Sequence, residues 1–484
     1  MATNIRSSGG GPSSAADAFP TRHLARPEVR DMPPGPSDNW RLIGPGVVAA
    51  GVGLASGEFI LYPYIASQVG LVFVWAAFVG LATQYFLNME IERYTLATGE
   101  TALTGFSRFW KHWGLVFALL AYFANIWPGW ATSSATLVTY LVGGDVRMIA
   151  IGMLLSIGII LTLAPVVYQA LEKIEMFKVA AVLVLVAVGA AFAIEAGDWA
   201  DVPQIVTQAS VPSGELGFAL LMGALAFAGA GGGQNLCQSN WIRDKRFGMG
   251  AYVPRIVSPL TGKPEAAPTT GYVFEPTVEN LAKWRRWWHF ANIEQLITFV
   301  AITFVTIFFT SLLAYATVFG QEGLQSDISF IRAEGEALRT DVGGWFGTLF
   351  WVIGAISLYA AAVGIVDYTS RLGADVIKVG YLRNATESTV YAALVWGLVG
   401  IGIVVLLAGF DQPLVLLVIS AVTGGLMMFI YSALLLMLNR KVLPEQIRPK
   451  GYRVAALVWS FALFGVLTVL TFNQQIQKLV GGGA

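Results

Sequence analysis

The sequence has few charged residues and a single cysteine. Only 12% of its 484 residues are charged, against about 25% in a typical soluble domain, while 56% are hydrophobic and the mean hydropathy is +0.64. Thirty basic residues balance thirty acidic ones, so no net field points to nucleic acid as a partner. One cysteine, Cys237, excludes an intrachain disulfide and a cysteine-based metal cluster. The sequence also lacks a P-loop, a zinc-protease motif and a nucleophile elbow, so we expect neither an enzyme nor a cofactor.

Long apolar runs recur from residue 42 onward, each long enough to cross a ~30 Å hydrocarbon core as a helix of about 20 residues. They predict an all-α membrane protein with about eleven transmembrane helices. The predicted spans are 42–68, 71–90, 114–142, 147–166, 171–195, 214–241, 289–318, 343–370, 389–409, 412–438 and 453–473. The composition of the remainder predicts a disordered cytoplasmic tail at 1–40, without the apolar core of a signal peptide, and a basic cytoplasmic loop at 243–288. The transmembrane domain is then predicted to cover 41–476.

The distribution of basic residues predicts the orientation, because cytoplasmic loops are enriched in Lys and Arg. With the N-terminal tail in the cytoplasm, the tail and alternate loops carry 26 of the 30 basic residues. The opposite side then carries Arg147, Arg332, Arg339 and Lys478. We therefore expect a multi-pass protein of the cell membrane, with a cytoplasmic N-terminus and a C-terminus outside.

Two predicted helices are weakened by glycine at matching places. Span one carries Gly51 and Gly53 before a polar stretch, and span six carries the run 229–233, in which four of five residues are glycine. Each helical glycine costs about 1 kcal/mol relative to alanine, and unwound backbone inside a bilayer must line a cavity or be buried in protein. Glycines that only permit close helix packing are the alternative interpretation, chiefly for Gly51 and Gly53.

The spacing of the two breaks predicts the architecture. Spans one and six are five apart, an odd number, so the second half of the chain repeats the first in inverted topology. Transporters built this way bind substrate between interrupted helices of the two halves. We expect a 5+5 inverted repeat, with repeat one at 42–195, repeat two at 214–438 and an extra helix at 453–473.

The motifs resemble those of the Nramp divalent-metal transporter family, which has the LeuT-type fold. The resemblance is carried by Gly44-Pro45-Gly46 at the start of span one, by span two into its loop (75–101), and by Asn235-Leu236 after the break in span six. It implies alternating access and metal ion transport, over residues 40 to about 475.

The metal-binding motifs of that family are missing here. Its Asp-Pro-Gly-Asn falls on Ala55-Ser56-Gly57-Glu58, and its Met-Pro-His falls on Gly232-Gly233-Gln234. The aspartate, the thioether and the imidazole are all absent, and a thioether is what favours transition metals over Mg²⁺. The stretch 114–142 also lacks the carboxylates that the family links to proton movement. The resemblance therefore predicts a divergent relative whose cargo is open.

The residues left at the breaks form the predicted site. An intramembrane carboxylate is costly and marks a functional site by default, so Glu58 is the leading residue; a structural lock on helix ends is its alternative role. Oxygen donors suit hard cations, and span-to-span hydrogen bonds are the alternative for the amides. The predicted substrate-binding set is Ala55, Ser56, Gly57, Glu58, Gly231, Gly232, Gly233, Gln234 and Asn235, with Glu58 and Gln234 as metal ligands.

Four further residues are candidates for a gate or pathway. Asp367 and Arg371 are four apart, which favours a salt bridge on one helix face. Trp127 and Trp130 flank a proline kink in span three and are predicted to wall the central site.

We expect a secondary transporter that moves a small cation, with a hard divalent metal such as Mg²⁺ or Mn²⁺ as the expected substrate and H⁺ or Na⁺ as candidate coupling ions. The same fold carrying an amino acid or similar solute is one alternative. The other is a non-transporting membrane sensor that binds a partner through loop 243–288.

Overall fold

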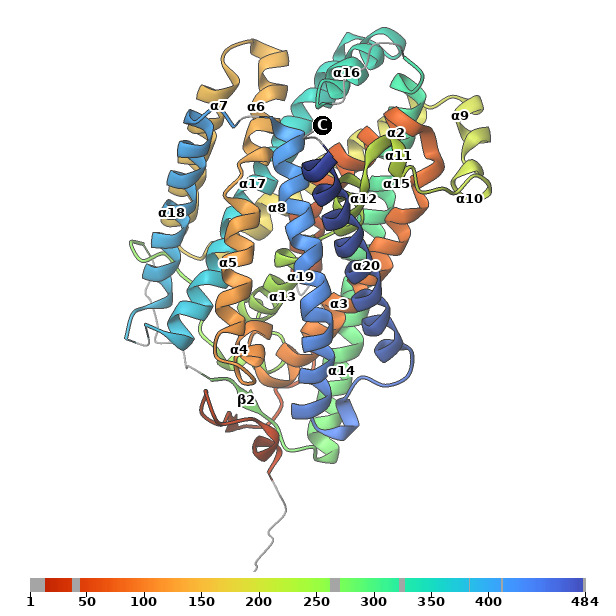
Figure 1. Cartoon of the computed structure of the whole chain (residues 1–484). Helices are drawn as coiled ribbons and strands as arrows, with labels where there is room; N and C mark the ends of the chain where they lie inside the picture. The colour runs from red at the N-terminus through yellow and green to blue at the C-terminus, as the bar shows by residue number, and fades with distance from the viewer. Residues whose placement is uncertain are drawn as a thin grey trace, which may run out of the picture.

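The computed structural model describes residues 14–36, 44–261, 270–321, 327–382, 384–410 and 412–481. Long helices run roughly along one axis and form a single bundle (Figure 1). The first half contains α1 (Pro45–Gly53), the π-helix η3 (Gly57–Leu61), α2 (Tyr62–Val69), η4 (Gly70–Phe73), α3 (Trp75–Thr98), α4 (Ala102–Ser107), α5 (Trp113–Asn125), α6 (Gly129–Val142), α7 (Val146–Leu163) and α8 (Val167–Phe192).

The second half has the same plan. It contains α12 (Phe218–Ala226), α13 (Gly233–Asp244), η5 (Gly248–Tyr252), α14 (Val278–Glu294), the π-helix η6 (Gln295–Val300), α15 (Ala301–Val318), α17 (Gly344–Gly380), α18 (Glu387–Leu407) and α19 (Pro413–Val442). After the short η7 (Glu445–Ile447), α20 (Tyr452–Gly481) packs along α19. Helices α9 (Ala196–Asp201), α10 (Gln204–Thr207), α11 (Ser213–Leu216) and α16 (Phe330–Asp341) cover one end of the bundle (Figure 1).

Nine helical stretches of the described chain are long and apolar enough to cross a membrane. Two further elements coincide with predicted spans. Helix α3 carries Glu90, Glu92 and Arg93 within its length, and the span-six element is divided into α12 and α13, each too short by itself. Helix and membrane character are therefore confirmed, and the number of eleven spans stays a prediction. Most predicted boundaries lie within a few residues of a helix end; α3 and α17 run on for eight and ten residues, and α14 begins eleven residues early.

The predicted disorder of the N-terminal tail is wrong for residues 14–36. This segment begins with the short helix η1 (Ala15–Ala18) and continues to β1 (Glu28–Val29), which pairs in parallel with β2 (Tyr272–Val273). Phe19 and Met32 are buried against the bundle. Composition predicted disorder because the few apolar residues here bury their side chains only in tertiary contacts. Residues 1–13 and 37–40 of the predicted tail lie outside the described residues.

The N-terminal segment and β2 lie at one end of the bundle, and the last turns of α20 lie toward the other (Figure 1). We call the end that carries β2 the inner end, following the predicted orientation. The side of the membrane that each end faces stays a prediction.

Candidate functional site

The break in span one lies at Leu54 and Ala55, between α1 and η3. Hydroxyl groups from the second half of the chain donate hydrogen bonds to backbone carbonyl oxygens at and just after this break. The Ser357 hydroxyl of α17 donates to the Leu54 carbonyl at 2.8 Å, and the Thr310 hydroxyl of α15 donates to the Glu58 carbonyl at 2.5 Å. The interruption is therefore held by hydrogen bonds from two other helices.

The break in span six covers residues 227–232. Gly229, Gly231 and Gly232 have φ values of 122°, 86° and 65°, a region that L-residues with a Cβ rarely occupy. The glycine run is thus a backbone requirement in span six, which excludes the interpretation that these residues only allow close packing.

Gln84 of α3 fills this break with its amide group. Its Oε1 accepts hydrogen bonds from the backbone N–H groups of Ala230 (2.8 Å) and Gly231 (3.1 Å). Its Nε2 lies 2.9 Å from the carbonyl oxygen of Ala226 and 3.1 Å from that of Ala228. One buried side chain therefore replaces several lost helical bonds. Gln84 is not among the site residues predicted from the sequence, although a glutamine inside the apolar stretch of span two is a signal that finds it.

The two breaks contact each other directly. A Cβ atom added to Gly53 would collide with the Gly229 carbonyl oxygen, and one added to Gly57 would collide with the Phe227 carbonyl oxygen. Gly53 and Gly57 are therefore close-approach positions, where only glycine lets the two backbones meet. The tertiary structure brings the span-one and span-six breaks together at the centre of the bundle, as the inverted repeat predicts.

Glu58 is fully buried beside this junction. Within the described chain, neither of its carboxylate oxygens has a hydrogen bond to another side chain. Two titratable groups are its electrostatic neighbours: Tyr62, one helical turn further along, and Lys178 of α8. The functional role of Glu58 and the structural-lock alternative, in which the carboxylate holds helix ends, both stay predictions.

Lys178 forms a buried ion pair with Glu175, at 2.8 Å between Nζ and Oε2. Both side chains are within 1% of complete burial, well inside α8. Glu175 also lies against Gly51 of α1 and Gly364 of α17, so the pair packs beside the inner half of span one. The sequence analysis counted Lys178 with the tail and loop residues, and the structure corrects that count. An acidic and a basic residue three apart within a predicted span are the signal that finds the pair.

The amides of span six do not join Glu58. The Gln234 Nε2 donates to the Ala49 carbonyl at 2.6 Å, more than two turns before Glu58 on the chain. The Asn235 Oδ1 accepts from the Gly232 N–H at 2.8 Å, and its Nδ2 donates to Asn88 of α3, also at 2.8 Å. Asn235 thus caps α13, and the predicted pairing of these amides with Glu58 as an all-oxygen ligand set is not what the described residues form.

The two tryptophans of span three, Trp127 and Trp130, have different surroundings. Trp130 is 4% exposed and its ring centroid lies 6.2 Å from that of Phe227, so it packs on the span-six break. Trp127 is half-buried and faces Phe123, an exposed side chain, with ring centroids 5.9 Å apart. Only Trp130 therefore packs on a break, and its role as a wall of the central site stays a prediction.

Arg371 of α17 is the centre of a buried network within the second half of the chain, near the inner end of the bundle. Its Nε lies 2.7 Å from an Asp367 oxygen, and its Nη1 contacts Asp244 at the end of α13. The hydroxyl of Tyr391 donates to the other Asp367 oxygen at 2.7 Å. The predicted salt bridge is present, and the second partner, Asp244, joins span six to span eight. This network lies on the inner side of the breaks, and a gate role for Asp367 and Arg371 stays a prediction.

Two interrupted helices that meet inside a helical bundle, at corresponding positions of its two halves, define the LeuT-type fold. Solved structures bear this out. The manganese transporter of Eremococcus coleocola, in complex with an aromatic bis-isothiourea substituted compound, superposes with a TM-score of 0.69 at 14% identity, covering 97% of this chain and 92% of that one. MhsT in complex with L-phenylalanine gives 0.51 at 12% identity, covering 92% and 99%. The nucleobase-cation-symport-1 family transporter Mhp1 gives 0.52 at 12%, covering 89% of each.

No protein-family model and no curated protein sequence matches this chain. At 12–14% identity the structural likeness establishes the fold. It confirms the helical LeuT-like architecture and the predicted resemblance at that level. The manganese transporter, the neighbour with the higher TM-score, covers the chain almost from end to end, so the architecture applies to nearly the whole sequence.

Proposed function

We propose that this protein is a secondary transporter that works by alternating access and carries one positive charge at Glu58. The observation that carries the proposal is the fully buried Glu58 carboxylate at the junction of two broken helices, without a hydrogen bond to another described side chain. An ionised carboxylate in the interior needs a compensating charge. A bound cation, the ammonium group of a solute or a coupling proton supplies it.

The charges around Glu58 favour a bound ion or group that carries a single positive charge. Glu58 and Glu175 contribute two negative charges when ionised, and Lys178 contributes one positive charge. One added charge makes this group neutral. A divalent ion would leave an uncompensated positive charge in a water-excluded interior, which is strongly unfavourable. H⁺ and Na⁺ are therefore the preferred ions at this site.

The expected Mg²⁺ or Mn²⁺ substrate has less support. No group of three or more His, Cys, Asp or Glu side chains able to hold a metal ion occurs among the described residues. Gln234 and Asn235 use their amide groups elsewhere.

The Arg371 network provides the inner gate of this proposal. It connects α13 to α17 and α18, all in the second half of the chain, and its four members are buried. Release of the substrate toward the inner end requires that these contacts separate. The proposed setting is the cell membrane, with the inner end in the cytoplasm.

The experiment is flux into proteoliposomes. Purified protein is reconstituted, and uptake of ²²Na⁺, Mn²⁺ and Mg²⁺ is measured together with internal pH, for the wild type and Glu58→Gln. We expect H⁺ or Na⁺ movement that Glu58→Gln reduces at least tenfold. The matched control is Glu445→Gln, which removes an exposed carboxylate of η7. Equal flux in Glu58→Gln and the wild type would reject the role of Glu58.

A second candidate is transport of a small organic solute with an ammonium group. Two observations favour it. The buried Lys178–Glu175 pair leaves the negative charge of Glu58 to be balanced by one further cationic group. Trp130 and Phe227 also form an aromatic contact at the break. A thermal-stability screen across amino acids, amines and metal salts separates the candidates. Stabilisation by an organic cation, lost in Glu58→Gln, supports this one; stabilisation only by divalent metals contradicts both candidates.

A further inference from the structure

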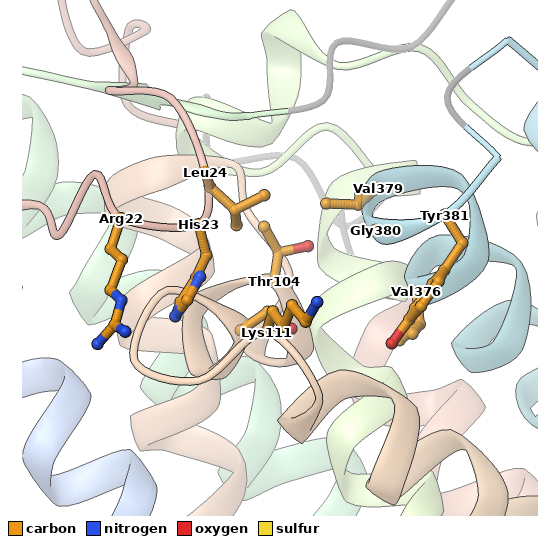
Figure 2. Close-up of a pocket in the computed structure, with 10 residues that line it drawn as sticks. Arg22, His23, Leu24, Thr104, Lys111, Val376, Val379, Gly380 and Tyr381 are labelled. Carbon is orange, nitrogen blue, oxygen red and sulfur yellow. The ribbon is translucent and has the colours of Figure 1, made fainter.

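The N-terminal segment 14–36 covers a cavity at the inner end of the bundle. The cavity has a volume of about 340 Å³, within the range of about 300–1,000 Å³ typical of small-molecule sites. Figure 2 shows its lining residues, which come from the N-terminal segment, α4, the α4–α5 turn and the end of α17. They are Arg22, His23, Leu24, Thr104, Ser107, Lys111, Val376, Val379, Gly380 and Tyr381.

The polar groups that line this cavity are hydrogen-bond donors, and none of them carries a negative charge. Arg22 and His23 extend from the N-terminal segment, and Lys111 extends from the α4–α5 turn (Figure 2). No carboxylate is among the lining residues. Leu24, Val376 and Val379 are buried and form its apolar wall.

These three basic side chains differ from their neighbours at the same end. Arg26 pairs with Asp17 at 2.6 Å, Arg30 pairs with Glu28 at 3.1 Å, and Arg108 pairs with Glu100. In the part of the chain that the structure describes, Arg22, His23 and Lys111 have no ion pair or hydrogen bond. Unpaired positive charge is thus gathered in one cavity, while the arginines around it are neutralised.

The Tyr381 hydroxyl adds one donor, while the hydroxyls of Thr104 and Ser107 donate to Asp375 and to the Leu103 carbonyl. Tyr381 lies 3.0 Å from His112 Nδ1, so its hydroxyl can accept from a protonated Nδ1 and point its own hydrogen into the cavity. Arginine and lysine together with hydroxyl donors are the groups that bind phosphate oxygens. A single guanidinium group is enough to bind a carboxylate. A cavity with three separate basic groups suits a multiply charged anion.

We propose that this cavity binds a phosphate-bearing anion. The ligand is a soluble phosphorylated compound or the headgroup of an anionic phospholipid. Trp110, next to Lys111, is 44% exposed, and exposed tryptophan is typical of the membrane interface, which places a lipid headgroup within reach. Because the N-terminal segment, α4 and α17 all line the cavity, the bound anion holds segment 14–36 to α4 and α17.

The test uses the full-length protein purified in detergent at about 150 mM salt, where distant surface charges are largely screened. Calorimetry with pyrophosphate and with inorganic phosphate measures the soluble source. Nanodiscs of phosphatidylcholine with and without phosphatidylinositol bisphosphate measure the lipid source. The test variant is Arg22→Ala/Lys111→Ala. The matched control is Arg440→Ala/Lys450→Ala, which removes two exposed basic residues outside the cavity.

We expect saturable binding of pyrophosphate or of the bisphosphate lipid, weakened at least tenfold in Arg22→Ala/Lys111→Ala and less than twofold in the control. Binding in the calorimeter identifies a soluble ligand, and binding confined to nanodiscs identifies a lipid. The proposal is overturned if the wild type binds no probe, or if both double variants lose affinity equally. Unchanged melting temperature of the test variant shows that the loss is not unfolding.

Discussion

The Oε1 atom of Gln84 accepts a hydrogen bond from the backbone N–H of Ala230 at 2.8 Å, so a side chain of α3 supports the unwound segment of span six. The unwound backbone can exist in the interior only because its polar groups have partners. This contact is therefore the first to be tested.

Replacing Gln84 with leucine should destabilise the protein strongly. The change leaves two backbone N–H groups and several carbonyls without the partner they have now, and each unsatisfied buried group costs about 1–3 kcal/mol. We expect a loss of at least about 3 kcal/mol in unfolding free energy, measured by chemical denaturation in detergent. Gln475→Leu, at an exposed position of α20, serves as the control and should change stability little.

Substitutions of Lys178 and Glu175 should have strongly non-additive effects on the unfolding free energy. Lys178→Met leaves Glu175 buried and unpaired, which should cost about 3–5 kcal/mol. Adding Glu175→Gln should recover most of that loss, because no uncompensated charge remains. The measurement is a double-mutant cycle of unfolding free energies. The exposed pair Lys283–Glu279, at 2.7 Å, is the comparison and should couple far more weakly, because solvent screens it. Equal coupling of the two pairs would contradict the buried electrostatic role.

The single cysteine reports on the inner gate. Cys237 of α13 is fully buried, with Asp244 and Arg371 among its electrostatic neighbours. Asp244→Asn removes one charged partner of Arg371 and should let the inner end open more often. We expect Cys237 to react with a maleimide at least tenfold faster in this variant. Asp341→Asn, an exposed change in α16 at the opposite end, should leave the rate unchanged. Slow labelling in both would show that the network does not control access.

The N-terminal segment should undock in acid. Burial disfavours the charged form of Glu100, but the paired Arg108 guanidinium outweighs burial and lowers the carboxyl pKa below its usual 4.5. A lowered pKa stabilises the folded state above the unfolded pKa, and that stability is lost as pH falls through the folded value. Arg108 also donates to the Ala25 carbonyl at 3.0 Å, which links this pair to segment 14–36. Trypsin cleavage within that segment should be slow from pH 8 to 5.

Glu100→Gln should speed that cleavage at neutral pH, because it leaves Arg108 without its charged partner. Cleavage of the wild type after brief exposure to pH below about 4 should rise toward the rate of the variant. Glu28→Gln removes an exposed pair in the same segment and should have little effect. Similar cleavage rates in Glu100→Gln and the wild type would show that the segment is held by other contacts.

Glu334 of α16 should make the folded protein more stable at low pH than at high pH. Its side chain is 3% exposed, and burial raises the pKa of this carboxyl well above its usual value. A raised pKa gives stability that is present below the unfolded pKa and is lost as pH rises toward the folded value. Glu334→Gln should therefore raise the melting temperature more at pH 8 than at pH 5. Glu336→Gln, at an exposed position paired with Arg332, should shift it equally at both pH values.

The sequence by itself determined the membrane character, the helical stretches and the place of both breaks. These follow from local properties: a hydrophobic run of about 20 residues inserts as a helix whatever its neighbours are, and glycines 229–233 weaken a helix on their own. The position of Glu58 inside a span was equally local, since a carboxylate in an apolar run is visible in the sequence.

Only the tertiary structure decided which groups meet. Gln84 reaches the span-six break across 146 positions of sequence, and Lys178 approaches Glu58 from another helix. Gln234 and Asn235 were adjacent to the break in sequence, yet a helix rotates successive side chains by about 100°, so neighbours along the chain face different partners. The order of residues 14–36 also depends on contacts with the loop at β2, far along the chain. Local chemistry located the breaks, and packing between distant helices fixed the partners and the charge balance around them.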